Sequence, residues 1–286
     1  MKSRRSDSAV EAVTQYTTIN GASTAYRVVG SGPPILMANR FRGTLDTWDP
    51  AFLDALAREN TVIPFDFPGV GYSEGKQLDS MEEAAGFIEA LRHSLHLDHF
   101  VILGWSWGGL AAQAFMLAHP EAITHAILLA TNPAGEVMVP LSPDFLERAL
   151  RPFNDLADEE VIFFEPASEL SRQRAEESRN RIRQRGDVDL RIPRTQEQFL
   201  PYFAAAQGFH ADVAGRRAEL EKGTTPCLVL CGDHDNSTAG QNWFPLIGRM
   251  RNAKFVFYSE TGHAPHHQYP EGVAEEIGRF LQSTGQ

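Results

Sequence analysis

The sequence predicts an α/β protein built on a doubly wound, mostly parallel sheet. Short apolar runs alternate with segments of helical periodicity along much of the chain, as in proteins made of strand–helix units. The alternation stops between residues 132 and 224, where the sequence is polar and rich in Arg and Glu, and then returns. With 286 residues, 42% of them hydrophobic, the chain can bury one large core. We therefore expect a flexible N-terminus at 1–14, a core formed by 15–131 and 225–286, and a helical insertion at 132–224.

Apolar or β-branched runs mark the candidate strands. The first two form an opening hairpin. Pro64 lies inside the fourth and removes a ladder donor, so we expect strand pairing to end near it. The expected strands are 15–20, 23–29, 33–38, 61–66, 100–103, 126–130, 227–231 and 254–258.

Helix starts are marked by capping residues. Asp49 followed by Pro50 combines an N-cap acid with Pro in the first turn. Ser80 and Glu83 have the spacing of a capping box. Further helices are expected at 109–118 and around 273–281, where apolar residues share one face.

Residues 104–108 read Gly-Trp-Ser-Trp-Gly and match G-x-S-x-G, the pattern of a nucleophile elbow. An expected strand enters this stretch and an Ala- and Leu-rich helix leaves it. Ser106 would then lie on a tight turn, with its hydroxyl exposed at a helix N-terminus. Gly104 and Gly108 would leave space for the sharp turn. The alternative is a Gly-rich turn in which the serine has no chemical role.

A serine nucleophile needs a base, usually His, and an acid that orients the base. Both candidates follow expected strands, in the order serine, acid, histidine. Asp233 and Asp235 are both candidates for the acidic residue, and we favour Asp235. Alternatively, either aspartate only stabilises a turn. The candidate base is His263, which precedes the last helix.

His266 and His267 are the nearest rivals of His263. The three histidines could also suggest a metal site with Asp233 or Asp235, but their spacing is not typical of zinc sites. We therefore expect neither a metal nor an organic cofactor.

With Ser106, Asp235 and His263 in this order, the sequence resembles the α/β-hydrolase superfamily over roughly residues 15–283. The resemblance implies an eight-stranded, mostly parallel sheet with a helical cap at 132–224, inserted after the sixth strand. The chain is similar to the single-domain esterases, lactonases, cofactor-free haloperoxidases and C–C bond hydrolases. Four further stretches carry the resemblance: D-x-P-G-x-G-x-S at 66–73, the loop at 41–48, G-x-x-D at 232–235 and Gly-His at 262–263.

The resemblance also implies an oxyanion hole formed by the backbone N–H groups of Phe41 and Trp107. The family usually carries His-Gly just before this loop, whereas this chain has Asn39 and Arg40. A large cation at this position suggests that Arg40 contacts a polar or anionic part of the substrate, with Asn39 as a second candidate contact. Alternatively, Arg40 points to solvent or pairs with a nearby acid.

The expected function is hydrolysis of a carboxylic ester or lactone through an acyl-enzyme. Aromatic residues of the cap could line an apolar pocket, although most of them are expected in the cap's own core. Two alternatives use the same triad: cleavage of C–C bonds, and perhydrolysis or haloperoxidation. A third alternative is a non-catalytic protein that binds a small molecule. The aromatic candidates are Phe153, Phe163, Phe164, Phe199, Tyr202, Phe203 and Phe209.

The composition disfavours nucleic acid and membranes as binding partners, so the expected partner is a small-molecule substrate. The formal net charge of −11 argues against a nucleic-acid surface, and the arginines at 172–185 are interleaved with Glu as on a solvated helix. Cys227 and Cys231 are expected to be small buried residues, which suggests a reducing compartment. Residues 1–12 lack the apolar core of a signal peptide, and no run is long enough to span a bilayer. These features predict a cytoplasmic protein without membrane contact; the oligomeric state is left open.

Overall fold

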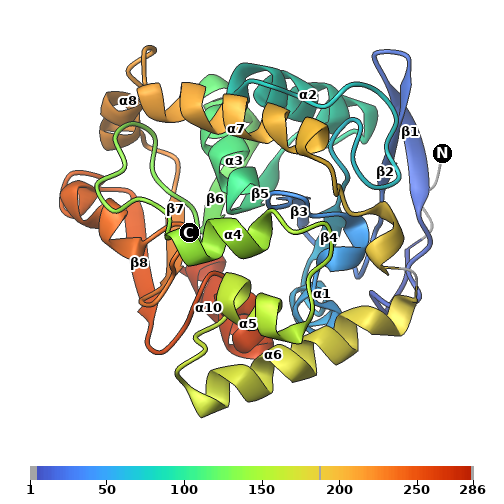
Figure 1. Cartoon of the computed structure of the whole chain (residues 1–286). Coiled ribbons are helices and arrows are strands. Elements are labelled where there is room, and N and C mark those ends of the chain that lie inside the picture. Colours follow the sequence, from blue (N-terminus) through green and yellow to red (C-terminus); the bar gives the residue numbers. More distant parts are fainter. Residues whose placement is uncertain (1–4, 187, 285–286) are drawn as a thin grey trace.

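A computed structural model describes residues 5–186 and 188–284, and it confirms the α/β class with a mostly parallel sheet (Figure 1). Six strands run parallel in the order β4-β3-β5-β6-β7-β8. Their bounds are Pro34–Ala38 (β3), Thr61–Pro64 (β4), Phe100–Trp105 (β5), Ile123–Leu129 (β6), Cys227–Gly232 (β7) and Ala253–Tyr258 (β8). The crossover order places β5, which leads into the predicted elbow, in the middle of the sheet.

The other two expected strands form a separate antiparallel pair, β1 (Gln15–Ile19) and β2 (Ala22–Tyr26). The chain after β2 continues along the edge strand β4, because Arg27 N–H donates to Pro64 O at 3.0 Å and Val29 exchanges two hydrogen bonds with Val62. The eight strands are thus divided between two sheets that meet at β4. The parallel ladder between β3 and β4 ends at Pro64, opposite Met37, as predicted. Pairing with the end of β2 continues beyond Pro64, because Asp66 N–H donates to Ala25 O at 3.0 Å.

Helices cover both faces of the parallel sheet (Figure 1). Alternate side chains of β5 point to opposite faces: Ile102 joins the core under α2 and α3, and Leu103 joins the core under α1 and α10. Cys227 and Cys231 are free and buried, as expected. The helices are α1 (Pro50–Ala57), α2 (Met81–Ser94), α3 (Trp107–Ala118), α4 (Pro143–Ala149), α5 (Leu156–Phe163), α6 (Glu169–Ile182), α7 (Gln196–Ala211), α8 (Arg216–Lys222), α9 (Pro265–Gln268) and α10 (Pro270–Thr284). Short 3-10 turns cover Leu45–Thr47, Pro120–Ala122, Arg183–Arg185, Val188–Arg191 and Gly240–Leu246.

The predicted caps are present with one difference. The Asp49 side chain accepts from Ala51 N–H, and Pro50 occupies the first turn of α1. Ser80 accepts from Glu83 N–H at the start of α2. The Glu83 carboxylate, however, bonds the N–H of Asp79 rather than that of Ser80, so the reciprocal bond of the capping box shifts by one residue.

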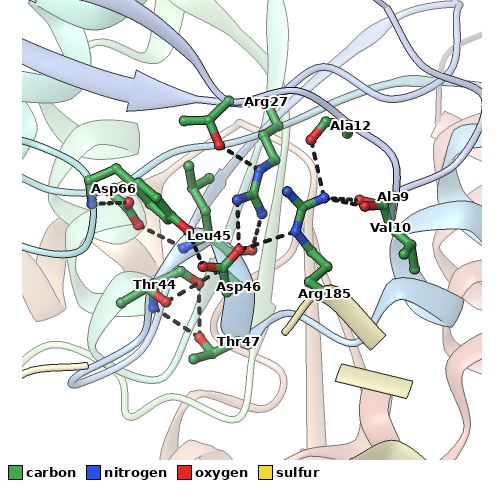
Figure 2. Close-up of polar contacts among 12 residues, drawn as sticks. Ala9, Val10, Ala12, Arg27, Thr44, Leu45, Asp46, Thr47, Asp66 and Arg185 are labelled. Atoms are coloured by element: carbon green, nitrogen blue, oxygen red, sulfur yellow. Dashed lines mark hydrogen bonds and ion pairs between the residues drawn. The ribbon is translucent and has the colours of Figure 1, made fainter. Parts of the chain in front are cut away.

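Helices α4 to α8 all lie between β6 and β7. In this segment the expectation of solvated arginines is partly wrong, because two of them turn inward to buried carboxylates. Arg181 pairs with Asp49, and Arg185 donates to Asp46 and to backbone carbonyls near the N-terminus (Figure 2). The sequence pattern around Arg181 and Arg185 did not reveal these partners, because they lie more than 100 residues away in the sequence. Charge-assisted hydrogen bonds from Arg181 and Arg185 thus bind this segment to the α/β core.

No helix among the described residues combines the length and apolar character required to traverse a bilayer.

Candidate active site

Ser106 occupies a sharp turn between β5 and α3. Its backbone has φ 56° and ψ −119°, a conformation that L-residues rarely adopt. Four hydrogen bonds to its backbone hold it there. Ser106 N–H donates to Leu129 O at 2.9 Å, and Ser106 O accepts from Gly109 N–H and the Thr131 hydroxyl, each at 2.8 Å, and from Leu110 N–H at 3.3 Å. The turn places the side chain at the N-terminus of α3, and the serine is only 8% exposed.

The glycines on either side of Ser106 are required by close packing. A Cβ on Gly104 would lie 2.2 Å from Gly108 O, and a Cβ on Gly108 would lie 2.2 Å from Ala38 O. These contacts lie well inside van der Waals distance. The spacing of the two glycines is therefore a requirement of the fold at the elbow, as the sequence predicted.

His263 contacts Asp235 and not Asp233. His263 Nδ1 lies 2.9 Å from Asp235 Oδ2, and both side chains are buried. Asp233 instead accepts the Thr261 N–H at 3.3 Å. Asp235 follows β7 and His263 follows β8, so neighbouring parallel strands deliver both groups to the same edge of the sheet.

The environment of Asp235 keeps the carboxyl charged. Burial alone would raise the pKa of Asp235, but His263 and hydrogen bonds to the carboxylate outweigh it and lower that pKa below its usual value. The bonds come from the N–H groups of Ser237 and Thr238 at 2.8 and 2.9 Å, and from the Thr238 hydroxyl at 2.8 Å. A buried carboxylate held in this way can orient the His263 ring through their contact.

The other two candidate histidines, His266 and His267, are buried next to the site among aromatic side chains. His266 is packed against Trp48, Phe52 and Trp105, and neither of its ring nitrogens has a hydrogen-bond partner among the described residues. Burial lowers the pKa of His267 to about 3, so this ring is neutral at ordinary pH. Within the described part of the chain, no cluster of three or more His, Cys, Asp or Glu side chains could hold a metal ion.

The loop after β3 is held by hydrogen bonds within the loop and by the Asp66 carboxylate; Figure 2 shows the part of it from Thr44 to Thr47. Asn39 Nδ2 donates to Thr44 O at 2.8 Å and to Thr47 Oγ1 at 3.1 Å, and Asn39 Oδ1 accepts Arg40 N–H at 2.8 Å. The Asp66 carboxylate accepts Leu45 N–H at 2.7 Å. The Asn39 side chain is thus engaged inside the loop, and we keep only Arg40 as a candidate substrate contact.

Phe41 and Trp107 present backbone N–H groups near the elbow. Trp107 is the first residue of α3, where an N–H has no acceptor within the helix. Phe41 follows Arg40 in a turn closed by the bond from Gly43 N–H to Arg40 O at 2.9 Å. Among the described residues neither N–H has a protein acceptor, so both remain able to bind a ligand oxygen.

Two cavities meet at Ser106. One, of about 70 Å³, is lined by Ser106 and His263 together with Arg40 and side chains of α4 and α5. The other, of about 130 Å³, is lined by Ser106, Trp107 and Leu110 and by mostly apolar side chains of α4 and α7.

Four of the seven aromatic candidates border these cavities: Phe153 and Phe163 the first, Tyr202 and Phe203 the second. Sequence reasoning missed other lining residues. Five come from the weakly patterned helices α4 and α5, and two from the stretch that precedes α7: Phe145, Leu146, Ala149, Glu159 and Ile162, and Ile192 and Arg194.

Comparison with known proteins identifies the family to which this fold belongs. A family model described as alpha/beta hydrolase fold matches residues 33–270. The poly(3-hydroxyalkanoate) depolymerase of Ectopseudomonas oleovorans is 30% identical over 88% of this chain and 86% of its own length. The biotin biosynthesis bifunctional protein BioHC of Teredinibacter turnerae is 26% identical over 82% of this chain but only 41% of its own length. This chain thus spans about two fifths of the first curated relatives it matches. Among solved structures, an alpha/beta hydrolase fold protein from Chitinophaga pinensis has a TM-score of 0.86 at 27% identity, covering 96% of this chain and 99% of that one.

Proposed function

Because the chain belongs to the alpha/beta hydrolase fold family, we propose that it hydrolyses a carboxylic ester or lactone with Ser106 as the nucleophile. One observation carries the proposal. Ser106 is held in a strained elbow and lines the same cavity as His263, whose ring is bonded to the buried Asp235. Strain of this kind persists where the surrounding structure enforces it, and it gathers at functional sites.

The proposed mechanism follows from the tautomer of His263. Because Nδ1–H donates to Asp235, Nε2 is left as the acceptor and takes the Ser106 proton. Ser106 Oγ attacks the carbonyl carbon, and the tetrahedral intermediate collapses to an acyl-serine as His263 returns the proton to the leaving alcohol oxygen. Water, deprotonated by the same nitrogen, attacks the acyl carbon and releases the acid, with the proton returning to Ser106.

Backbone N–H groups of Phe41 and Trp107 would bind the negative oxygen of each tetrahedral intermediate. Their lack of protein acceptors and their position beside Ser106 support this role. A single donor of this kind typically lowers the barrier by about 3 kcal/mol. Asn39 and Arg40, which replace the family's usual residues, therefore leave the backbone donors in place.

The substrate class is inferred from the cavities. The larger cavity is lined by Leu110, Leu146 and Phe203 among others, which suits an apolar or aromatic portion of a small ester. We propose that the segment 132–224 acts as the cap, since its helices supply much of both cavity linings. The relative from Ectopseudomonas oleovorans makes a 3-hydroxyalkanoate ester a natural member of the substrate panel.

Turnover of a panel of 4-nitrophenyl esters, aliphatic lactones and a 3-hydroxyalkanoate ester tests the proposal. Wild-type protein should hydrolyse at least one of them. Ser106→Ala should lose nearly all of that activity, and Asp235→Asn should lose about 10⁴-fold, because His263 would then be held in the wrong tautomer. Turnover at the wild-type rate in Ser106→Ala would overturn the assignment.

A further inference from the structure

Arg40 is a half-buried cation that forms no ion pair with a carboxylate of the described residues, although Glu159 lies close enough to attract it electrostatically. Its side chain lines the cavity that contains Ser106 and His263. No carboxylate of the described residues lies within 4.0 Å of its guanidinium, and its Nε is buried without any partner. One bond is made within the loop, from Nη1 to Phe41 O at 2.7 Å. A charge that is partly removed from water and has a buried donor without an acceptor is costly unless something else compensates it.

Two aromatic rings hold the Arg40 guanidinium beside the cavity. It lies 4.5 Å from the ring centre of Phe163 and 5.2 Å from that of Trp105. Burial first, and then Arg42, lower the pKa of Arg40 to about 9, which still leaves it charged at neutral pH. The rings provide cation–π attraction and fix the plane of the group, but they supply no hydrogen-bond acceptor.

The other charged residues of this cavity already have partners. Glu159 is paired with Arg179, and Asp189 with Arg183. Arg42 donates to the carbonyls of Ala149, Arg151, Pro152 and Pro193. Arg194 donates to the Asp189 carbonyl and lies over the ring of Phe153.

We propose that Arg40 binds an anionic group of the substrate, most simply a carboxylate, in the cavity beside Ser106. The substrate would then be an ester with an apolar portion and a separate acidic group. The cavity of about 70 Å³ exceeds the roughly 10–15 Å³ that one water needs, and it can hold a group of carboxylate size. A guanidinium offers paired donors whose geometry matches a carboxylate. This inference rests on the proposed function of Ser106 and names the substrate class of the same site.

Matched ester pairs test the proposal. The 4-nitrophenyl monoesters of succinate, glutarate, adipate and pimelate are compared with neutral esters of the same length that end in an isopropyl group. The readout is the ratio of kcat/KM for the acidic ester over its neutral partner, because this ratio cancels general damage to catalysis. Arg40→Gln should lower the ratio about 10- to 100-fold for the best acid length, and Arg40→Lys should retain part of it.

The control variant is Arg58→Gln, which removes one positive charge from an exposed ion pair with Glu271. Its ratio should match that of wild type, because screening weakens the effect of a distant surface charge. An unchanged ratio in Arg40→Gln would overturn the proposal. An equal loss on both esters would also overturn it, because Arg40 would then serve only the shape of the oxyanion loop.

Failure of the proposed function would look different, since wild-type protein would hydrolyse neither ester of any pair. In that case calorimetry of hexanoate and hexanamide binding tests the anion site by itself. Hexanoate should bind at least tenfold more tightly than hexanamide to wild type, and this preference should disappear in Arg40→Gln. An equal preference in both proteins would overturn the inference.

Discussion

Replacing Ser106 by Gly should make the protein more stable than replacing it by Ala. Both variants lose the hydroxyl, so they differ only in the Cβ at a position with φ 56° and ψ −119°. Alanine keeps the backbone strain, whereas glycine adopts positive φ at little cost. The strain at such a position is on the order of 1–3 kcal/mol.

Glycine also gains entropy in the unfolded chain, which offsets about 0.4–1 kcal/mol of that relief. The expected net gain of Ser106→Gly over Ser106→Ala is therefore between about 0 and 2.6 kcal/mol in the free energy of unfolding, with a midpoint of about 1.3 kcal/mol. In a chain of this size that corresponds to a rise in Tm of roughly 2–4 °C per kcal/mol.

Urea unfolding followed by circular dichroism measures the difference. Ser178, in the interior of α6, provides the control, because there glycine should be less stable than alanine by about 0.5–1 kcal/mol. If Ser106→Gly were less stable than Ser106→Ala, as is expected of the glycine variant at position 178, the claim that the backbone at Ser106 is strained would be refuted.

Three further predictions follow from the surroundings of the site. Gly108→Ala would place a Cβ 2.2 Å from Ala38 O, so it should lower the free energy of unfolding by about 1–3 kcal/mol and reduce ester turnover, measured on the same preparation. Arg42→Met should expose residues 149–154 to limited proteolysis, because it removes the donors that bind this stretch to the loop after β3; cleavage no faster than in wild type would contradict this. Burial raises the pKa of Asp66 from 3.8 to about 7, so the folded state holds a proton that the unfolded chain releases. The contribution of Asp66 therefore favours folding below about pH 4 and is lost as the pH rises through about 7, and Asp66→Asn should flatten the urea midpoint over this interval.

The elbow and the triad candidates could be predicted because each is encoded locally. Gly104, Ser106 and Gly108 lie within five residues, and the acid and the histidine directly follow buried strands whose ends meet in a parallel sheet. The choice of Asp235 over Asp233 agrees with the observed contact to His263.

The environment of Arg40 could not be predicted in the same way. It is decided by Phe163 on α5, more than 100 residues away, and by the pairing of Glu159 with Arg179. The helices between β6 and β7 carry weak apolar patterns, so periodicity did not indicate which side chains face the cavities. The inward turn of Arg185 toward Asp46 has the same origin, since only tertiary packing brings the two together (Figure 2).

The central claim is that Ser106 is an activated nucleophile. Treatment with a fluorophosphonate followed by intact-mass measurement tests it most directly, with Ser106→Ala alongside wild type. The account predicts a single phosphonate adduct on the wild-type protein and none on Ser106→Ala. No adduct on folded wild-type protein, or an adduct that persists in Ser106→Ala, would contradict it.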